Sequence, residues 1–287
     1  MITITSTQNP HVKNVIKLND RRARDEARRT VVEGAREVGL ALGRGVVPVE
    51  AFICPELIDG PAAETAARHL VTIGQTGMSE VFYVSPEVFA KMAYRGGSGG
   101  LLLVVAYRPA RLDDIQIRGV PFLVIVEEAE KPGNLGAVLR TADAAGVDAV
   151  IVPIPPGSRG TDLHNPNVIR ASLGAYFTVP AVAAPSDEAI AWLRAHDIAI
   201  VAATPAAETL YTAADLSGRV AVAVGSEAWG LGEAWLAAAD VRVRIPMSGQ
   251  VDSLNLSASA ALLMYEVVRQ RGGAGEQGGR GAGEIDS

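Results

Sequence analysis

Residues 245–266 read IPMSGQVDSLNLSASAALLMYE: the end of a strand, a polar loop and the start of a long apolar helix. Ser253 and Asn255 stand where the loop becomes the helix, and side chains of these types either cap free helix amides or hold a ligand. The helix is apolar on nearly every side, with Ala and Ser where a close neighbour must fit, so we expect it to be buried. A polar loop on a rigid buried helix is a suitable framework for a binding site.

Upstream of this stretch, from Val120 onward, short apolar segments alternate with helical ones. Alternation of this kind indicates a mostly parallel sheet covered by helices on both faces. The expected strands are 122–126, 149–152, 177–182, 198–203, 220–224 and 241–245. The expected helices are 136–145, 166–175, 187–196, 232–238 and 256–269.

The chain is long enough for about two domains. Residues 1–107 have the pattern of a small α/β domain, and residues 108–119 are a plausible linker. Residues 120–271 form the parallel α/β domain. The tail, residues 272–287, is rich in glycine and polar residues, so we expect it to be disordered.

Composition excludes several classes of protein. Cys54 is the only cysteine, which excludes an intramolecular disulfide and a cysteine-based zinc cluster. The four histidines are scattered without metal-ligand spacing, so we expect no metal. No apolar run approaches the roughly 20 residues of a membrane helix, and the N-terminus lacks the pattern of a signal peptide. These features together predict a cytoplasmic protein.

Charge is distributed unevenly, although the net charge is −6. Seven basic residues and three acidic ones lie between His11 and Val31, and a second basic stretch includes Arg95. One basic cluster alone is as readily explained by a solvated helix face as by a binding surface. Two clusters in the same half of an acidic protein favour a phosphate-binding surface. The candidate phosphate contacts are Arg21, Arg22, Arg24, Arg29 and Arg95.

Two other loops of the parallel domain follow predicted strands, where such sheets bind ligands. In EEAEKPGNLGAVLR (127–140), Asn134 stands near the start of a helix and is either its cap or part of a site, and Arg140 lies in the helix body. In GSEAWG (225–230), glycine permits close backbone approach to a ligand, and Glu227 is either a helix N-terminal acid or a site residue. The loop is neither a Walker A motif nor a complete G-x-G-x-x-G fingerprint.

Taken together, Asn134-Leu-Gly-x-x-x-Arg140, Gly225-Ser-Glu-x-x-Gly230 and Ile245-Pro-Met-x-Gly-x-x-x-Ser-Leu-Asn255 closely resemble the three motifs of the SpoU/TrmH (SPOUT) family. Members of this family are RNA ribose 2′-O-methyltransferases that use S-adenosylmethionine. The resemblance covers about residues 120–270. It implies a parallel α/β sheet with a C-terminal trefoil knot, preceded by an L30e-like α/β domain that binds RNA, and it implies a homodimer with sites near the subunit interface.

The resemblance also assigns roles to residues. It implies a catalytic group made of Asn134, Arg140, Glu227, Ser253 and Asn255, with Arg140 as the proton acceptor. Since arginine is effectively always protonated, a cationic role for Arg140 is physically easier. Arg170 matches an arginine that grips phosphate. The implied cofactor contacts are Ala203, Thr204, Gly225, Ser226, Gly230, Ile245, Pro246, Met247 and Leu254.

The most favoured substrate is 23S rRNA. The arginine-rich N-terminal domain is similar to that of actinomycete enzymes that methylate 23S rRNA and protect a producer from its own antibiotic, of the thiostrepton- and avilamycin-resistance kind. The alternatives are a housekeeping 23S rRNA enzyme, a tRNA ribose methyltransferase, and a catalytically silent RNA-binding or ribosome-assembly protein. A dinucleotide-dependent oxidoreductase is disfavoured by the missing fingerprint.

Overall fold

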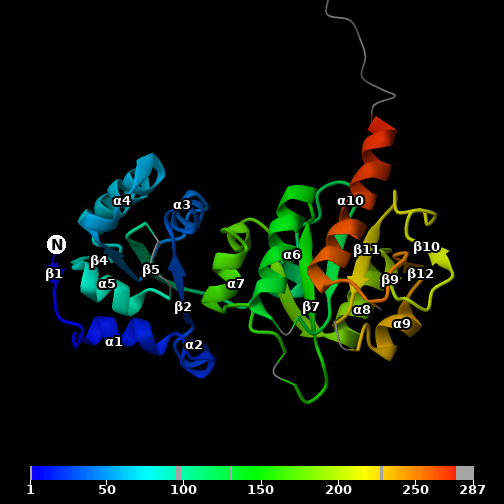
Figure 1. Cartoon of the computed structure of the whole chain (residues 1–287), viewed down its shortest axis with the longest axis horizontal. Coiled ribbons are helices and arrows are strands. Elements are labelled where there is room, and N and C mark those ends of the chain that lie inside the picture. The colour runs from blue at the N-terminus through cyan, green and yellow to red at the C-terminus, as the bar shows by residue number, and fades with distance from the viewer. Residues whose placement is uncertain are drawn as a thin grey trace, which may run out of the picture. The chain divides into compact units, whose positions relative to one another are not determined.

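The computed structural model describes residues 2–94, 99–129, 131–158, 160–226, 229–251 and 253–275. Contacts between residues divide the chain into two compact units (Figure 1). The N-terminal unit comprises Met1–Ala110, Lys131–Arg140 and Asp162–Ala181; the C-terminal unit comprises Arg111–Glu130, Thr141–Thr161 and Val182–Ser287. Among the described residues, each unit contains one sheet.

The sheet of the N-terminal unit is mixed and has the strand order β1-β4-β3-β5-β2. Its pairs β1–β4 and β4–β3 are parallel, and β3–β5 and β5–β2 are antiparallel. The strands are β1 (Ile2–Ile4), β2 (Arg29–Glu33), β3 (Glu50–Ile53), β4 (Glu80–Val84) and β5 (Leu101–Ala106). The helices are α1 (Pro10–Lys17), α2 (Arg21–Ala27), α3 (Ala35–Gly43), α4 (Gly60–Gln75), α5 (Pro86–Met92) and α7 (Pro166–Ala171).

Helices cover both faces of this sheet (Figure 1). One face packs against α1 and α5 through residues such as Val12, Val15 and Phe89. The other face packs against α3 and α4, and Ile169 of α7 joins that core. Local signals start the helices: the Asn9 side chain accepts a hydrogen bond from the His11 amide, and Asp20 accepts one from Ala23.

The C-terminal unit contains a seven-stranded sheet with the order β10-β12-β9-β11-β6-β7-β8. The pairs β10–β12, β12–β9, β9–β11, β11–β6 and β6–β7 are all parallel, which confirms the predicted architecture. The strands are β6 (Phe122–Val126), β7 (Ala149–Ile154), β8 (Ala181–Pro185), β9 (Ala199–Ala203), β10 (Thr209–Leu210), β11 (Val220–Val224) and β12 (Val241–Arg244).

Helices α8 (Ser186–Ala195) and α9 (Glu233–Ala238) pack on β9 and on each other, and α10 (Leu256–Gly275) packs on β11. Helix α6 (Pro132–Ala145) contributes residues to both units. Within the described residues, no helix is long and apolar enough to cross a membrane. The trefoil knot and the L30e-like topology stay predictions.

Several sequence predictions need correction. The strand expected at 177–182 is β8 at Ala181–Pro185, because Pro180 lacks an amide donor and Ala175–Phe177 form a 3₁₀ turn instead. Strands β1, β4 and β10 were not expected. Helix α10 continues to Gly275, into the segment predicted to be disordered, and the rest of that tail lies outside the described residues.

Helix α10 is also less buried than its composition predicts. Leu263, Met264 and Val267 are buried, but Leu262 is 38% exposed and Tyr265 is 50% exposed. The reason is geometric: the sheet can cover only one side of a helix packed on it, so the apolar residues on the other side remain accessible.

Residues 162–181 are fastened to the N-terminal sheet by a network around His164. The Thr30 hydroxyl donates to the His164 carbonyl oxygen at 2.6 Å, and the imidazole stacks on Tyr107 with 3.6 Å between ring centroids. Its Nδ1 lies 2.5 Å from the Tyr176 hydroxyl, and Tyr107 donates to Asp25. Burial lowers the pKa of His164 to about 4, against the opposing effect of Asp162 and Asp25.

This pKa shift predicts a loss of stability in mild acid. Between about pH 6.5 and pH 4 the unfolded chain protonates His164 and the folded chain does not, so stability falls as pH falls through that window. We expect wild-type protein to lose about 2 kcal/mol more unfolding free energy between pH 7 and pH 5 than His164→Gln does. Urea unfolding at the two pH values measures this difference, and equal losses in both proteins would contradict it.

Candidate functional site

A cavity of about 380 Å³ lies at the carboxyl ends of β9, β11 and β12, three strands adjacent in the sheet. Its walls come from the loops that follow these strands, together with residues of α9 and the start of α10. The lining residues are Ala203, Thr204, Pro205, Val224, Gly225, Ser226, Trp229, Gly230, Leu231, Leu236, Ile245, Met247, Ser253, Leu254, Leu256 and Ser259. Ligands of parallel α/β sheets bind at this edge.

The loop after β11 folds into a tight turn. The Ser226 and Gly230 backbones exchange hydrogen bonds of 3.1 and 2.9 Å, and the Ser226 hydroxyl accepts a 3.1 Å bond from the Trp229 amide. Gly225 lies so close to the returning chain that a Cβ there would stand 2.0 Å from the Gly230 carbonyl oxygen. A side chain at position 225 is therefore incompatible with this turn.

Glu127 supports the same loop and is a residue that the sequence analysis did not select. Its carboxylate is buried and accepts a 2.5 Å hydrogen bond from the Gly232 amide, while its own amide donates to the Val224 carbonyl oxygen. Burial raises the pKa of Glu127, and the Gly232 amide opposes that shift. One feature of the sequence could have identified Glu127: it is an acidic residue directly after a buried strand, where burying a carboxylate without a hydrogen-bond partner would cost free energy.

The predicted cofactor contacts converge on this cavity: all of them except Pro246 are lining residues. Sequence reasoning included Ile245 and Leu254 but missed three leucines of the wall, Leu231, Leu236 and Leu256. These side chains fall in ordinary apolar segments, so only their position in space distinguishes them from core residues. Their role in cofactor binding stays a prediction.

The predicted catalytic residues are distributed over several elements. Ser253 lines the cavity, and Asn255 caps α10 by accepting hydrogen bonds from the Ser257 amide at 3.0 Å and hydroxyl at 2.6 Å. The capping interpretation thus holds for the Asn255 side-chain oxygen. Asn134 and Arg140 lie on α6 in the N-terminal unit, with Arg140 exposed. Glu227 lies outside the described residues.

The predicted phosphate contacts of the N-terminal unit divide into accessible and buried residues. Arg22 has an 81% exposed side chain and pairs with Glu26 at 2.7 Å; Arg29 is also exposed. Arg21 is partly buried and lies 3.8 Å from the Asp25 carboxylate. Arg95 lies outside the described residues. Arg22 and Arg29 are therefore the accessible members of this group.

Arg24 is not accessible to RNA, which corrects its assignment. It is 1% exposed, and its Nη1 donates to the carbonyl oxygens of Leu18 at 2.6 Å and Asn19 at 2.9 Å. Its Nη2 pairs with the Asp162 carboxylate. A cation at the carbonyl end of α1 is favourable for the helix dipole, so this arginine is structural.

Arg170 lies on α7, with its guanidinium 5.2 Å from the centroid of the Tyr94 ring. This cation–π contact fixes the side chain beside an exposed aromatic residue. The arrangement leaves the predicted phosphate contact chemically reasonable, and its role stays a prediction.

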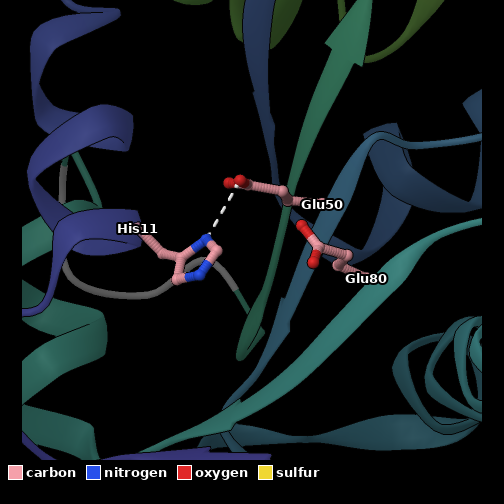
Figure 2. A group of neighbouring side chains, drawn as sticks. All are labelled: His11, Glu50 and Glu80. Carbon is pink, nitrogen blue, oxygen red and sulfur yellow. Dashed lines mark hydrogen bonds and ion pairs between the residues drawn. The ribbon is translucent and has the colours of Figure 1, made fainter.

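Figure 2 shows a group that sequence spacing did not reveal: His11, Glu50 and Glu80, whose ligand-type atoms all lie within 4.8 Å of one another. Glu50 and Glu80 are register partners on the parallel strands β3 and β4, so their side chains emerge on the same face. His11 Nδ1 lies 3.1 Å from the buried Glu50 carboxylate, and its ring contacts Phe82. These contacts hold α1 on the sheet; the expectation that the protein uses no metal stays a prediction.

Comparison with known proteins gives two family matches. Residues 121–265 match the SpoU rRNA Methylase family, and residues 9–102 match the MRM3-like substrate binding domain. The 23S rRNA (uridine(2479)-2′-O)-methyltransferase of Streptomyces viridochromogenes is 30% identical over 262 residues, which span 88% of this chain and 87% of that protein.

Solved structures agree with these matches. A crystal structure of an RNA 2′-O ribose methyltransferase is 41% identical, with a TM-score of 0.81, over 94% of this chain and 99% of that one. The AdoMet-bound rRNA methyltransferase of Sinorhizobium meliloti is 29% identical, with a TM-score of 0.82, over 93% and 97% of the two chains.

The buried position of Arg24 generates a stability prediction. Arg24→Ala leaves Asp162 without its cation and two helix-end carbonyl groups without their donor, so we expect it to lower the free energy of unfolding by about 3 kcal/mol. Arg22→Ala removes only an exposed pair and should cost less than about 1 kcal/mol. Denaturant unfolding compares the two variants; equal costs would show that Arg24 is not structural.

Proposed function

The chain belongs to the SpoU rRNA methylase family, and from that membership we propose that it methylates the ribose 2′-hydroxyl of a nucleotide in 23S rRNA. S-adenosylmethionine is the methyl donor. The relative from S. viridochromogenes is named as a 23S rRNA 2′-O-methyltransferase and matches this chain over both family segments. That match, over 88% of this chain and 87% of the relative, supports 23S rRNA as the substrate.

The observation that carries the proposal is the cavity at the ends of β9, β11 and β12. Its volume of about 380 Å³ lies within the usual range of ligand pockets, roughly 300–1,000 Å³. Aliphatic walls such as Ile245 and Leu254 suit the faces of an adenine. The turn at Gly225–Gly230 brings backbone groups close enough to contact a bound nucleoside.

The chemistry of methyl transfer decides what the chain must supply. The donor is a sulfonium and brings an already electrophilic methyl group, so no acid is needed to activate it. The ribose hydroxyl is a poor nucleophile, so it must be aligned with the donor and must lose its proton. The protein's residues therefore have to position the ribose and stabilise negative charge on its 2′ oxygen.

Arg140 is the residue we assign to that charge. Its side chain is exposed, so it is accessible to an RNA substrate. As a permanent cation it would pair with a phosphate and stabilise the developing alkoxide. Ser253, at the cavity wall, and Asn255, at the start of α10, would order the loop next to the donor. The family resemblance also implies roles in the reaction for Glu227, Asn134 and Arg170.

We also propose that the protein is a homodimer that pairs through the exposed side of α10. Leu262 and Tyr265 remain accessible on a helix whose other side is fully packed. Exposed apolar residues along one helix side mark a contact surface. Light scattering at micromolar concentration tests the dimer directly, and a monomeric mass would refute it.

The substrate is tested by mapping. Primer extension at low nucleotide concentration, on 23S rRNA from cells with and without the gene, should show one stop that depends on the gene. The purified protein should restore that stop on unmodified rRNA when S-adenosylmethionine is added. Methylation of tRNA alone would replace the substrate, and no methylation of any RNA would favour a silent RNA-binding protein. The predicted antibiotic resistance is tested by comparing the susceptibility of the same cells.

The turn after β11 generates a prediction about cofactor affinity. In Gly225→Ala the new Cβ would overlap the Gly230 carbonyl group, so the turn must open. We expect the Kd for S-adenosylmethionine to rise by at least about tenfold, as measured by isothermal titration calorimetry. Gly218→Ala is the matched control, because a Cβ at Gly218 meets nothing within 4 Å. Equal affinities in the two variants would place the cofactor elsewhere.

Arg140 generates a prediction about catalysis. Arg140→Ala should lower kcat/KM for RNA by about a hundredfold or more, since it removes a cation that stabilises the transition state. Its thermal unfolding should match that of wild type, because the side chain is exposed. Tritium transfer from labelled S-adenosylmethionine measures activity. Arg140→Lys, which keeps the charge but not the planar fork, should be intermediate; near-normal turnover in Arg140→Ala would reject the assignment.

A further inference from the structure

Trp229 is the most exposed large hydrophobic residue of the described chain, with 83% of its surface accessible. Trp235, in the same unit, is completely buried. Tryptophan is highly buried on average, and tryptophan side chains are enriched at binding interfaces. The exposure of Trp229 therefore calls for a ligand or partner.

Trp229 is held in place by its backbone. Its amide donates to the Ser226 hydroxyl, inside the turn that the Ser226 and Gly230 backbones close. Just beyond the turn, the Gly232 amide is held by the buried Glu127 carboxylate. The backbone amides of Trp229 and Gly232 are thus both held by hydrogen bonds, which lowers the entropy cost of positioning the indole on binding.

Trp229 also lies at the cavity proposed to hold the methyl donor. Trp229 is the one aromatic residue among the lining residues, and aliphatic residues of the wall such as Leu231 and Leu254 are far less exposed. Because Trp229 lines the cavity and is also 83% exposed, its indole is accessible to a ligand that approaches the cavity from outside. Methyl transfer requires the ribose 2′ oxygen to reach the donor directly, so RNA must approach that opening.

We propose that the indole of Trp229 is a stacking platform for a nucleobase of the substrate RNA, at or next to the methylated nucleotide. This inference rests on the proposed function. Single-stranded RNA is bound by stacking unpaired bases on aromatic side chains, and such stacking tolerates any base because every base has a π-face. Trp229 would accordingly position the target nucleotide without reading its identity.

Tryptophan fluorescence reports this contact directly. Unmodified 23S rRNA should quench the emission of wild-type protein and of Trp192→Phe, because both retain Trp229. Trp192 is a suitable control: it lies in α8, stacks on His196 just after the end of that helix, and is not part of the cavity wall. Trp229→Phe should lose the RNA-dependent quenching. Quenching that persists in Trp229→Phe would overturn the inference.

Kinetics separates RNA binding from cofactor binding. Trp229→Ala should raise KM for RNA by about tenfold, Trp229→Phe should raise it less, and in both the change in the Kd for S-adenosylmethionine should be smaller than the change in KM for RNA. A weaker Kd for S-adenosylmethionine with unchanged KM for RNA would show that the indole covers the cofactor instead. Dissociation of a dimer in Trp229→Ala would show a subunit contact. Either result overturns the inference.

The proposed function and this inference fail in different ways. If wild-type protein shows RNA-dependent quenching through Trp229 but transfers no methyl group to any RNA, the proposed function is wrong and the stacking contact stands. If wild-type protein methylates 23S rRNA and Trp229→Ala does so with unchanged KM for RNA, the function stands and the stacking contact is wrong.

Discussion

The parallel register of β12, β9 and β11 is the constraint on which the candidate site depends. Val243 pairs with Ala203, and Ala202 pairs with Ala223, so all three strands run in one direction and end at one edge. Parallel strands leave their following loops on the same side of a sheet. Segments that begin at Thr204, Gly225 and Ile245 therefore meet around one cavity although they are distant in sequence.

The loops at that edge combine close approach with buried support. Gly225 allows the chain to return within contact of Gly230, which a residue with a side chain would prevent. Glu127, at the end of the neighbouring strand β6, accepts the Gly232 amide from a buried position. A buried carboxylate is stable only where hydrogen-bond donors are positioned to reach it. This contact therefore links the segment after the Gly225–Gly230 motif to the end of β6, the strand that precedes the motif containing Asn134 and Arg140.

The N-terminal unit shows why charge patterns overestimate a binding surface. Arg22 and Arg24 are two residues apart on α2, so they face different directions. Arg22 is exposed, whereas Arg24 turns inward to the carbonyl end of α1 and to Asp162. The amino-acid composition does not distinguish these two arginines, because both are basic. The distinction depends on Asp162, which is 138 positions away and was not a visible partner in the sequence.

The sequence by itself determined the parallel α/β architecture, the three motifs and nearly all of the polar and glycine residues at the cavity, because strand and helix periods, turn glycines and motif spacing are local signals. Only the tertiary structure showed which further residues belong to the site and which candidate residues are structural instead. Glu127, Leu231 and Trp229 gain significance from neighbours distant in sequence, and Arg24 and His164 become structural for the same reason. Burial and pairing are properties of folded neighbours, so local pattern does not encode them.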